Sequence, residues 1–155
     1  MTRAPVARTA PPGPAGVAQA VRPVMLITLN VPFDPAAITF ALETAAETGA
    51  ELYICDAIPL EYRNSIGHVA RQYAEQHNRR YLDEVARTAR DRGIRTTQLA
   101  FHNPKPIQAT LEVLSQESVG LLVFGPDKTR LGRWAFRRAA RRLRESASCL
   151  VWTNE

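Results

Sequence analysis

A dense group of basic side chains near the end of the chain is the feature of the sequence best equipped for chemistry. The residues between 128 and 144 include eight that are positively charged, namely Lys128, Arg130, Arg133, Arg137, Arg138, Arg141, Arg142 and Arg144. Arginine binds phosphate and carboxylate through two parallel hydrogen bonds, so this segment could hold an anion. Arg130 and Arg133 would do most of this, because they lie nearest the preceding apolar run.

Two other interpretations of the basic segment stay open. On a helix, one ridge would carry Arg133, Arg137, Arg141 and Arg144. Such arginines could simply cover apolar surface with their stems and pair with nearby acids. They could also bind an extended polyanion, RNA or DNA. Against nucleic acid as a partner, no nucleic-acid module is recognisable, and Trp134 is the one aromatic platform beside the arginines.

The histidines and cysteines form no catalytic or metal-binding pattern. His68, His77 and His102 share no metal-ligand spacing with each other or with a cysteine. Cys55 and Cys149 each lie inside an apolar stretch, which is typical of buried thiols in a reducing compartment. No nucleophile elbow surrounds a serine. The sequence therefore gives no positive evidence for catalysis and predicts no metal.

Composition favours one soluble domain. The 155 residues are 45% hydrophobic and 23% charged, with a net charge of +5, which favours attraction to anions. No apolar run approaches the roughly 18 residues of a membrane-spanning helix, and no secretory signal is recognisable. We expect a disordered Pro/Ala-rich tail over residues 1–22, a domain over residues 23–155, and a bacterial, cytoplasmic setting.

Apolar runs alternate with helical patterns after the tail. We expect strands over residues 24–29, 51–58, 94–101, 121–124 and 149–152. We expect helices over residues 35–48, 65–92, about 107 to Gly120, and 133–144, with loops over 102–106 and 125–132. Asp34 should cap the first helix, with Pro35 at its first position, and Gly49 should end it. Five strands alternating with four helices predict a parallel sheet covered on both faces.

Ligands of such folds bind beyond the carboxyl ends of the strands, where the strand order reverses. The loops over residues 30–34 and 125–132 are therefore the first places to look for a site. Asp56 is unusual in its apolar run. It either faces the cleft beside Asn30 or caps a local loop.

Several segments, taken in order, resemble the universal stress protein family over about residues 22–152. The segment Ala36–Pro59 is similar to the family's first helix and second strand, Leu122–Gly125 to its fourth strand, and Leu143–Val151 to its last helix end and fifth strand. The resemblance implies a Rossmann-like five-stranded parallel sheet with helices on both faces, of the universal stress protein / adenine nucleotide α-hydrolase-like type. It also implies a homodimer through the last strand, formed by Cys149, Leu150, Val151 and Trp152.

The ATP-binding members of the family resemble one another in an aspartate after the first strand and a loop of the form G-x2-G-x9-G-[ST] after the fourth. Glycines let backbone N–H groups approach phosphates, and the following helix adds partial positive charge. Here Asn30 takes the aspartate's place and Gly125 matches the first glycine. Lys128 stands at the second, and Arg138-Ala139 stand where a glycine and a hydroxyl residue belong.

The sequence therefore predicts a non-catalytic regulatory or binding module that does not bind ATP in the family's usual way. One alternative is a stress protein that binds a nucleotide, ATP or AMP, or a small anion through its loop arginines. A second is a basic accessory protein that binds a polyanion. The candidate ligand-contacting residues are Asn30, Ala57, Gly125, Lys128, Arg130 and Arg133.

Overall fold

Five parallel strands form the centre of the structure, a computed structural model that describes residues 21–59 and 79–155. The strands are β1 (Val24–Thr28), β2 (Leu52–Pro59), β3 (Thr96–Asn103), β4 (Leu121–Phe124) and β5 (Leu150–Thr153). Their order across the sheet is β3-β2-β1-β4-β5, and every neighbouring pair is parallel. The strand order reverses between β1 and β4. The predicted Rossmann-like sheet is confirmed.

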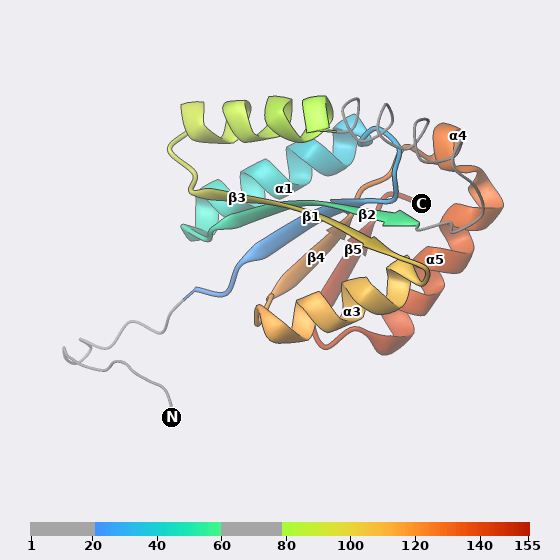
Figure 1. The fold of residues 1–155 in the computed structure, drawn as a ribbon. Helices are drawn as coiled ribbons and strands as arrows, with labels where there is room; N and C mark the ends of the chain where they lie inside the picture. Colours follow the sequence, from blue (N-terminus) through green and yellow to red (C-terminus); the bar gives the residue numbers. More distant parts are fainter. Residues whose placement is uncertain (1–20, 60–78) are drawn as a thin grey trace.

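Helices cover both faces of the sheet (Figure 1). One face packs against α1 (Pro35–Thr48) and the second helix, whose described part covers residues 79–91. The other packs against α3 (Pro106–Gln116) and α5 (Arg133–Ser146). β1 lies at the centre and is buried at all five positions, which explains its uninterrupted apolar sequence. Its side chains alternate, so that Leu26 enters the first core and Ile27 the second.

The ends of α1 follow from local sequence, as predicted. The Asp34 carboxylate accepts a hydrogen bond from the Ala36 N–H at 3.1 Å, and Pro35 occupies the first turn, where no N–H is needed. Gly49 ends the helix in the left-handed conformation, with φ of 72°. Residues 1–20 of the tail expected over 1–22, and the expected helical residues 65–78, including His77, lie outside the described residues.

Most strand ends and the end of α5 differ from the sequence-based expectation by one or two residues, and three differences need a comment. β3 continues to Asn103, because it pairs with β2 along all eight of its residues. α3 ends at Gln116, ahead of Gly120, and Ser118 makes the turn with φ of 52°. The expected loop over residues 125–132 contains a short helix, α4 (Lys128–Leu131), which is capped by Asp127.

Candidate anion-binding site

Backbone hydrogen bonds join the loop after β1 to the loop after β4. The Gly125 N–H donates to the Ile27 carbonyl at 2.8 Å, and the Gly125 carbonyl accepts from the Asp34 N–H at 2.8 Å. The Asp127 N–H donates to the Pro32 carbonyl at 2.9 Å. These bonds continue the pairing of β1 with β4 beyond the ends of both strands. Both backbone polar groups of Gly125 are therefore engaged within the protein.

Gly125 also sits where a side chain would not fit. A Cβ atom built on it would lie 2.8 Å from Leu26 Cδ1 and 3.0 Å from Ala37 Cβ. Carbon atoms in favourable contact are about 3.5–4.0 Å apart. Close packing of β4 against β1 and α1 is thus enough to explain this glycine, whose position matches the first glycine of the ATP-binding loop.

The other two early candidates, Asn30 and Ala57, lie in the loop after β1 and within β2. Asn30 adopts the left-handed conformation with φ of 60°, and its N–H donates to Asp56 Oδ1 at 2.7 Å. Of the two placements expected for Asp56, the structure shows the one beside Asn30, where the buried carboxylate holds the loop after β1. Ala57 is fully buried in the core under α3 and α5, so its side chain offers no surface to a ligand.

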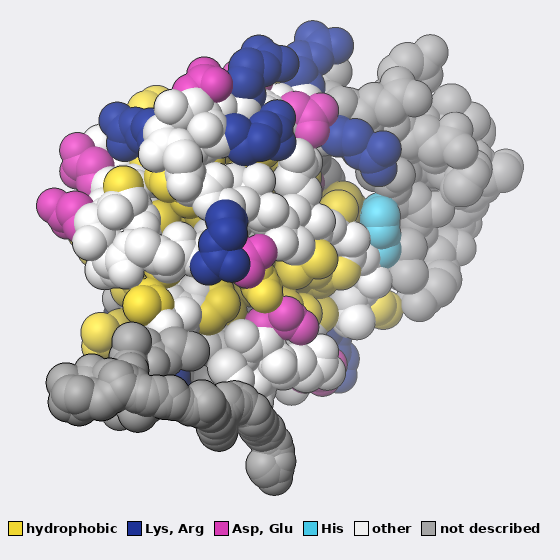
Figure 2. All heavy atoms as spheres, turned by 90° about the vertical axis from the view of Figure 1, so that its left-hand side faces the viewer, with side chains coloured by type: hydrophobic (Ala, Val, Ile, Leu, Met, Phe, Trp, Pro, Cys, Tyr) yellow, Lys and Arg dark blue, Asp and Glu magenta, His cyan; other side chains and the backbone are white. Residues whose placement is uncertain are grey.

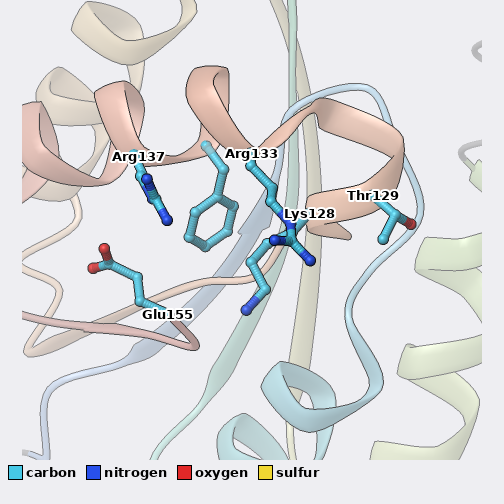
Figure 3. Close-up of a pocket in the computed structure, with 6 residues that line it drawn as sticks. Lys128, Thr129, Arg133, Arg137 and Glu155 are labelled. Carbon is cyan, nitrogen blue, oxygen red and sulfur yellow. The ribbon is translucent and has the colours of Figure 1, made fainter.

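A pocket of about 350 Å³ lies where α4 meets the start of α5 (Figure 3). Its lining residues are Lys128, Thr129, Arg133, Phe136, Arg137 and Glu155. In Figure 3, Lys128, Arg133 and Arg137 extend from the helices toward the same space, and Glu155 approaches from the opposite side. Figure 1 shows α4, the start of α5 and the C-terminus gathered at the carboxyl end of the sheet.

Of the residues singled out from sequence, the structure brings Lys128 and Arg133 together in this pocket and leaves Arg130 outside its lining. Arg137 also lines the pocket, although it was not among the ligand contacts predicted from the sequence. The sequence did indicate it, because residues four apart share one face of a helix, as Arg133 and Arg137 do here. Glu155 was also missed, and the sequence contains no local signal for it.

Asp127 and Gly132 position the two helices that build the pocket. Asp127 Oδ1 accepts from the Thr129 N–H at 2.9 Å and from the Thr129 hydroxyl at 2.7 Å, and this fixes the first turn of α4. The same hydrogen bonds hold the pKa of the Asp127 carboxyl below its usual value. Gly132, with φ of 98°, then turns the chain from α4 into α5, a conformation that favours glycine. Lys128 Nζ lies 5.8 Å from the centre of the Phe136 ring, a cation–π contact.

The last three residues, which we call the C-terminal strap (residues 153–155), cross from α1 to α5. The Asn154 amide donates to Asp34 Oδ2 at 2.7 Å, at the start of α1. The Thr153 hydroxyl donates to Glu155 Oε2 at 2.9 Å, and Arg144 forms an ion pair with that carboxylate. The Arg144 guanidinium holds the pKa of Glu155 below its usual value. The strap thus holds an ionised carboxylate at the wall of the basic pocket.

The positions that correspond to the later glycines of the ATP-binding loop lie in helices. Lys128 begins α4, and Arg138 is the sixth residue of α5. The hydrogen bonding of α5 starts with the Phe136 N–H, which donates to the Gly132 carbonyl at 2.9 Å. Because the following N–H groups inside a helix bond to carbonyls four residues earlier, the N–H of Arg138 is not available to a phosphate.

Across residues 21–59 and 79–155, no cluster of three or more His, Cys, Asp or Glu side chains could hold a metal ion. Within the same two ranges, every helix is too short or too polar to cross a membrane.

These features define an open, doubly wound α/β protein with a basic pocket next to its topological switch point. The chain matches the universal stress protein family over residues 21–153 and belongs to that family, as the sequence predicted. No curated protein matches it in sequence.

Similar solved structures agree in fold. A universal stress family protein from Burkholderia pseudomallei has 18% identity and a TM-score of 0.66, with 84% of this chain and 94% of that chain covered. The universal stress protein from Archaeoglobus fulgidus in complex with dAMP has 17% identity and a TM-score of 0.65, with 87% and 98% covered. A family protein from Arabidopsis thaliana with AMP bound has 14% identity and a TM-score of 0.58, with 84% and 90% covered.

Proposed function

We propose that this chain is a non-catalytic universal stress protein that binds a small phosphate-bearing anion, such as AMP, in the basic pocket. It does so through side chains and not through the backbone cradle by which ATP is usually held. The observation that carries the proposal is the convergence of Lys128, Arg133 and Arg137 on one pocket beside the switch point.

The geometry of the former phosphate loop argues against the usual mode of ATP binding. Such a cradle needs backbone N–H groups that are open to the ligand. At Gly125 that group bonds to Ile27, and at Arg138 it lies within α5. Binding in the usual way would require both the β1–β4 junction and the first turns of α5 to open.

The chemistry of the pocket favours a phosphate or carboxylate. Three cations face one carboxylate there, so the pocket carries excess positive charge. The Glu155 carboxylate is an oxyanion already seated at this wall. A volume of about 350 Å³ falls at the lower end of the range for small-ligand sites, roughly 300–1,000 Å³. AMP and dAMP, the ligands of two of the similar structures, each carry one phosphate.

Thermal unfolding with AMP, ATP, inorganic phosphate and adenosine tests the proposal. A ligand at 100 times its Kd stabilises the folded state by about 2.7 kcal/mol, which raises Tm by several degrees. We expect this shift with AMP, a smaller one with phosphate, and none with adenosine. The double variant K128Q/R133Q should abolish it.

Arg130→Gln is the matched control for each pocket substitution, because it removes one charge from α4 at a residue outside the pocket lining. Its AMP-induced shift should equal that of the unsubstituted protein. The proposal fails if no anion at millimolar concentration raises Tm. It also fails if R130Q abolishes the shift as completely as the pocket variant does.

We further propose that the protein forms a homodimer through β5. β5 is an edge strand, and the side chain of Leu150 on it is 75% exposed. Trp152 stacks on Phe40 of α1 in its own chain, with ring centres 4.5 Å apart, so Leu150 is the side chain better placed to meet a partner. Leu150→Glu should convert the dimer to a monomer in light scattering, and Val21→Glu, at another exposed apolar residue, should not.

A further inference from the structure

The side of α5 that faces away from the sheet carries an exposed tryptophan among arginines. The inward side of α5 is buried through Phe136, Ala139, Ala140 and Leu143. The outer face, as we call it, consists of Trp134, Arg138, Arg141 and Arg142, all exposed. Trp134 is 73% exposed, although core packing normally buries most of a tryptophan. Packing among the described residues gives no reason for an aromatic ring at this position.

Trp134 and Arg138 form a pre-arranged pair. The Arg138 guanidinium lies 4.5 Å from the centre of the Trp134 ring, a cation–π contact between residues one helical turn apart. The contact restricts both side chains, while most of the ring stays in solvent. The outer face therefore has, at one end, an exposed aromatic ring and a guanidinium whose positions are already restricted before a ligand binds.

Within the described residues, Arg138, Arg141 and Arg142 form no ion pair, although Glu145 lies one helical turn beyond Arg141. Within the described ranges, the one arginine of α5 that forms an ion pair is Arg144, which lies on the pocket side. Arg142 donates to the neutral Gln108 amide oxygen at 3.1 Å. By contrast, basic and acidic side chains lie next to one another on the face of the molecule seen in Figure 2. The interpretation of the basic helix as a self-paired solvated face therefore fits Arg144 but not Arg138, Arg141 and Arg142.

We propose that the outer face of α5 binds single-stranded nucleic acid, with a base stacked on Trp134 and phosphates held by Arg138, Arg141 and Arg142. Proteins that bind single strands combine a basic track for the backbone with aromatic rings that stack on bases. A duplex fits less well, because its bases already stack on each other and cannot reach the ring. Sequence alone counted against a nucleic-acid partner. The exposed ring, its guanidinium partner, and three arginines that form no ion pair among the described residues favour such a partner.

Fluorescence anisotropy with labelled ten-nucleotide dT and rU strands tests this surface. Neutralising three phosphates should give a slope of log K against log salt of about −2, because each contact to a single strand contributes about −0.7. Trp134→Ala should weaken binding roughly tenfold at constant salt, as loss of one base stack does. The double variant R141Q/R142Q should flatten the slope by about 1.4.

R87Q/R90Q is the matched control. It removes the same charge from exposed arginines of the helix over residues 79–91, on the opposite face of the sheet, and should leave affinity and slope unchanged. The pocket variant K128Q/R133Q should retain binding of the strands, so that this proposal and the pocket proposal fail independently. Equal binding of dT and rU shows recognition of bases and phosphates, whereas preference for rU assigns the ligand as RNA.

Four outcomes would overturn the inference. The first is failure of both strands to bind in low salt, and the second is unchanged affinity in the Trp134→Ala variant. The third is displacement of the strand by polyglutamate at equal charge, which would indicate an acidic protein segment as the partner. The fourth is equal binding of a duplex of the same length. Trp134 is exposed, so its replacement should not prevent folding, and circular dichroism checks this.

Discussion

Replacing Gly125 by alanine separates a packing role from a ligand-binding role at the one glycine that matches the family's phosphate loop. The added Cβ would lie 2.8 Å from Leu26 Cδ1 and 3.0 Å from Ala37 Cβ, and both neighbours are fully buried. To restore ordinary carbon contacts, these groups must move apart by roughly 0.5–1 Å. We therefore expect the alanine variant to be less stable.

The size of the effect follows from two opposing contributions. Overpacking a close-packed core costs about 1–3 kcal/mol. Replacing glycine by alanine at a compatible backbone position restricts the unfolded chain and stabilises by about 0.4–1 kcal/mol. The steric cost is the larger, so Gly125→Ala should lower the free energy of unfolding by about 1–2 kcal/mol.

Urea unfolding monitored by circular dichroism measures this change, and a double-mutant cycle assigns its cause. Leu26→Ala alone should cost about 2–5 kcal/mol because it leaves a cavity. The double variant G125A/L26A should be more stable than the sum of the two single effects predicts, since the new methyl group enters the space that the leucine leaves. The reasoning is refuted if G125A keeps full stability but loses the AMP-induced shift in Tm, because the glycine would then serve a ligand.

Three further predictions concern ionisable groups. Glu155→Gln should tighten AMP binding severalfold in calorimetry, because it removes the carboxylate that faces the pocket cations; losing the exposed pair with Arg144 should cost under about 1 kcal/mol of stability. The lowered pKa of Asp127 means that its stabilising effect is complete above the ordinary aspartate pKa of about 3.9 and is lost as pH falls through the folded-state pKa. Asp127→Asn should therefore reduce the acid dependence of the urea midpoint, and unchanged dependence would contradict this. Burial raises the thiol pKa of both Cys55 and Cys149, but only Cys149 is partly accessible. Mass spectrometry after mild alkylation at pH 8 should therefore find Cys149 labelled before Cys55.

Helices and strands that are determined by their own residues could be predicted well from the sequence. The start of α1 follows from an aspartate followed by proline, and its end from a glycine that adopts positive φ. β1 follows from a short apolar run, which is typical of a strand buried on both faces. The end of β3 could not be predicted in this way, because its last residues are held by pairing with β2 and not by their own propensity.

The candidate site likewise has features that local sequence predicts and features that depend on tertiary packing. The carboxyl end of the sheet was predictable, since parallel strands place all their following loops there. Which arginines share the pocket depends on how α5 is rotated against the sheet, and this is set by the packing of Phe136 and Leu143. The contact of Asn154 with Asp34 joins residues 120 positions apart in the sequence, and nothing in either segment indicates it.

The position of α5 has a consequence for any attempt to restore the family's ATP-binding loop by design. Substituting glycine at residues 128 and 138 and a hydroxyl residue at 139 would recover the sequence of the motif but not its shape, because α4 and the first turns of α5 would remain helical. About five residues of helix, some 7–8 Å, separate the start of α5 from residue 138. A redesign would have to unwind that length and lengthen the loop after β4. The loss of the motif is thus a change of secondary structure, which point substitutions do not reverse.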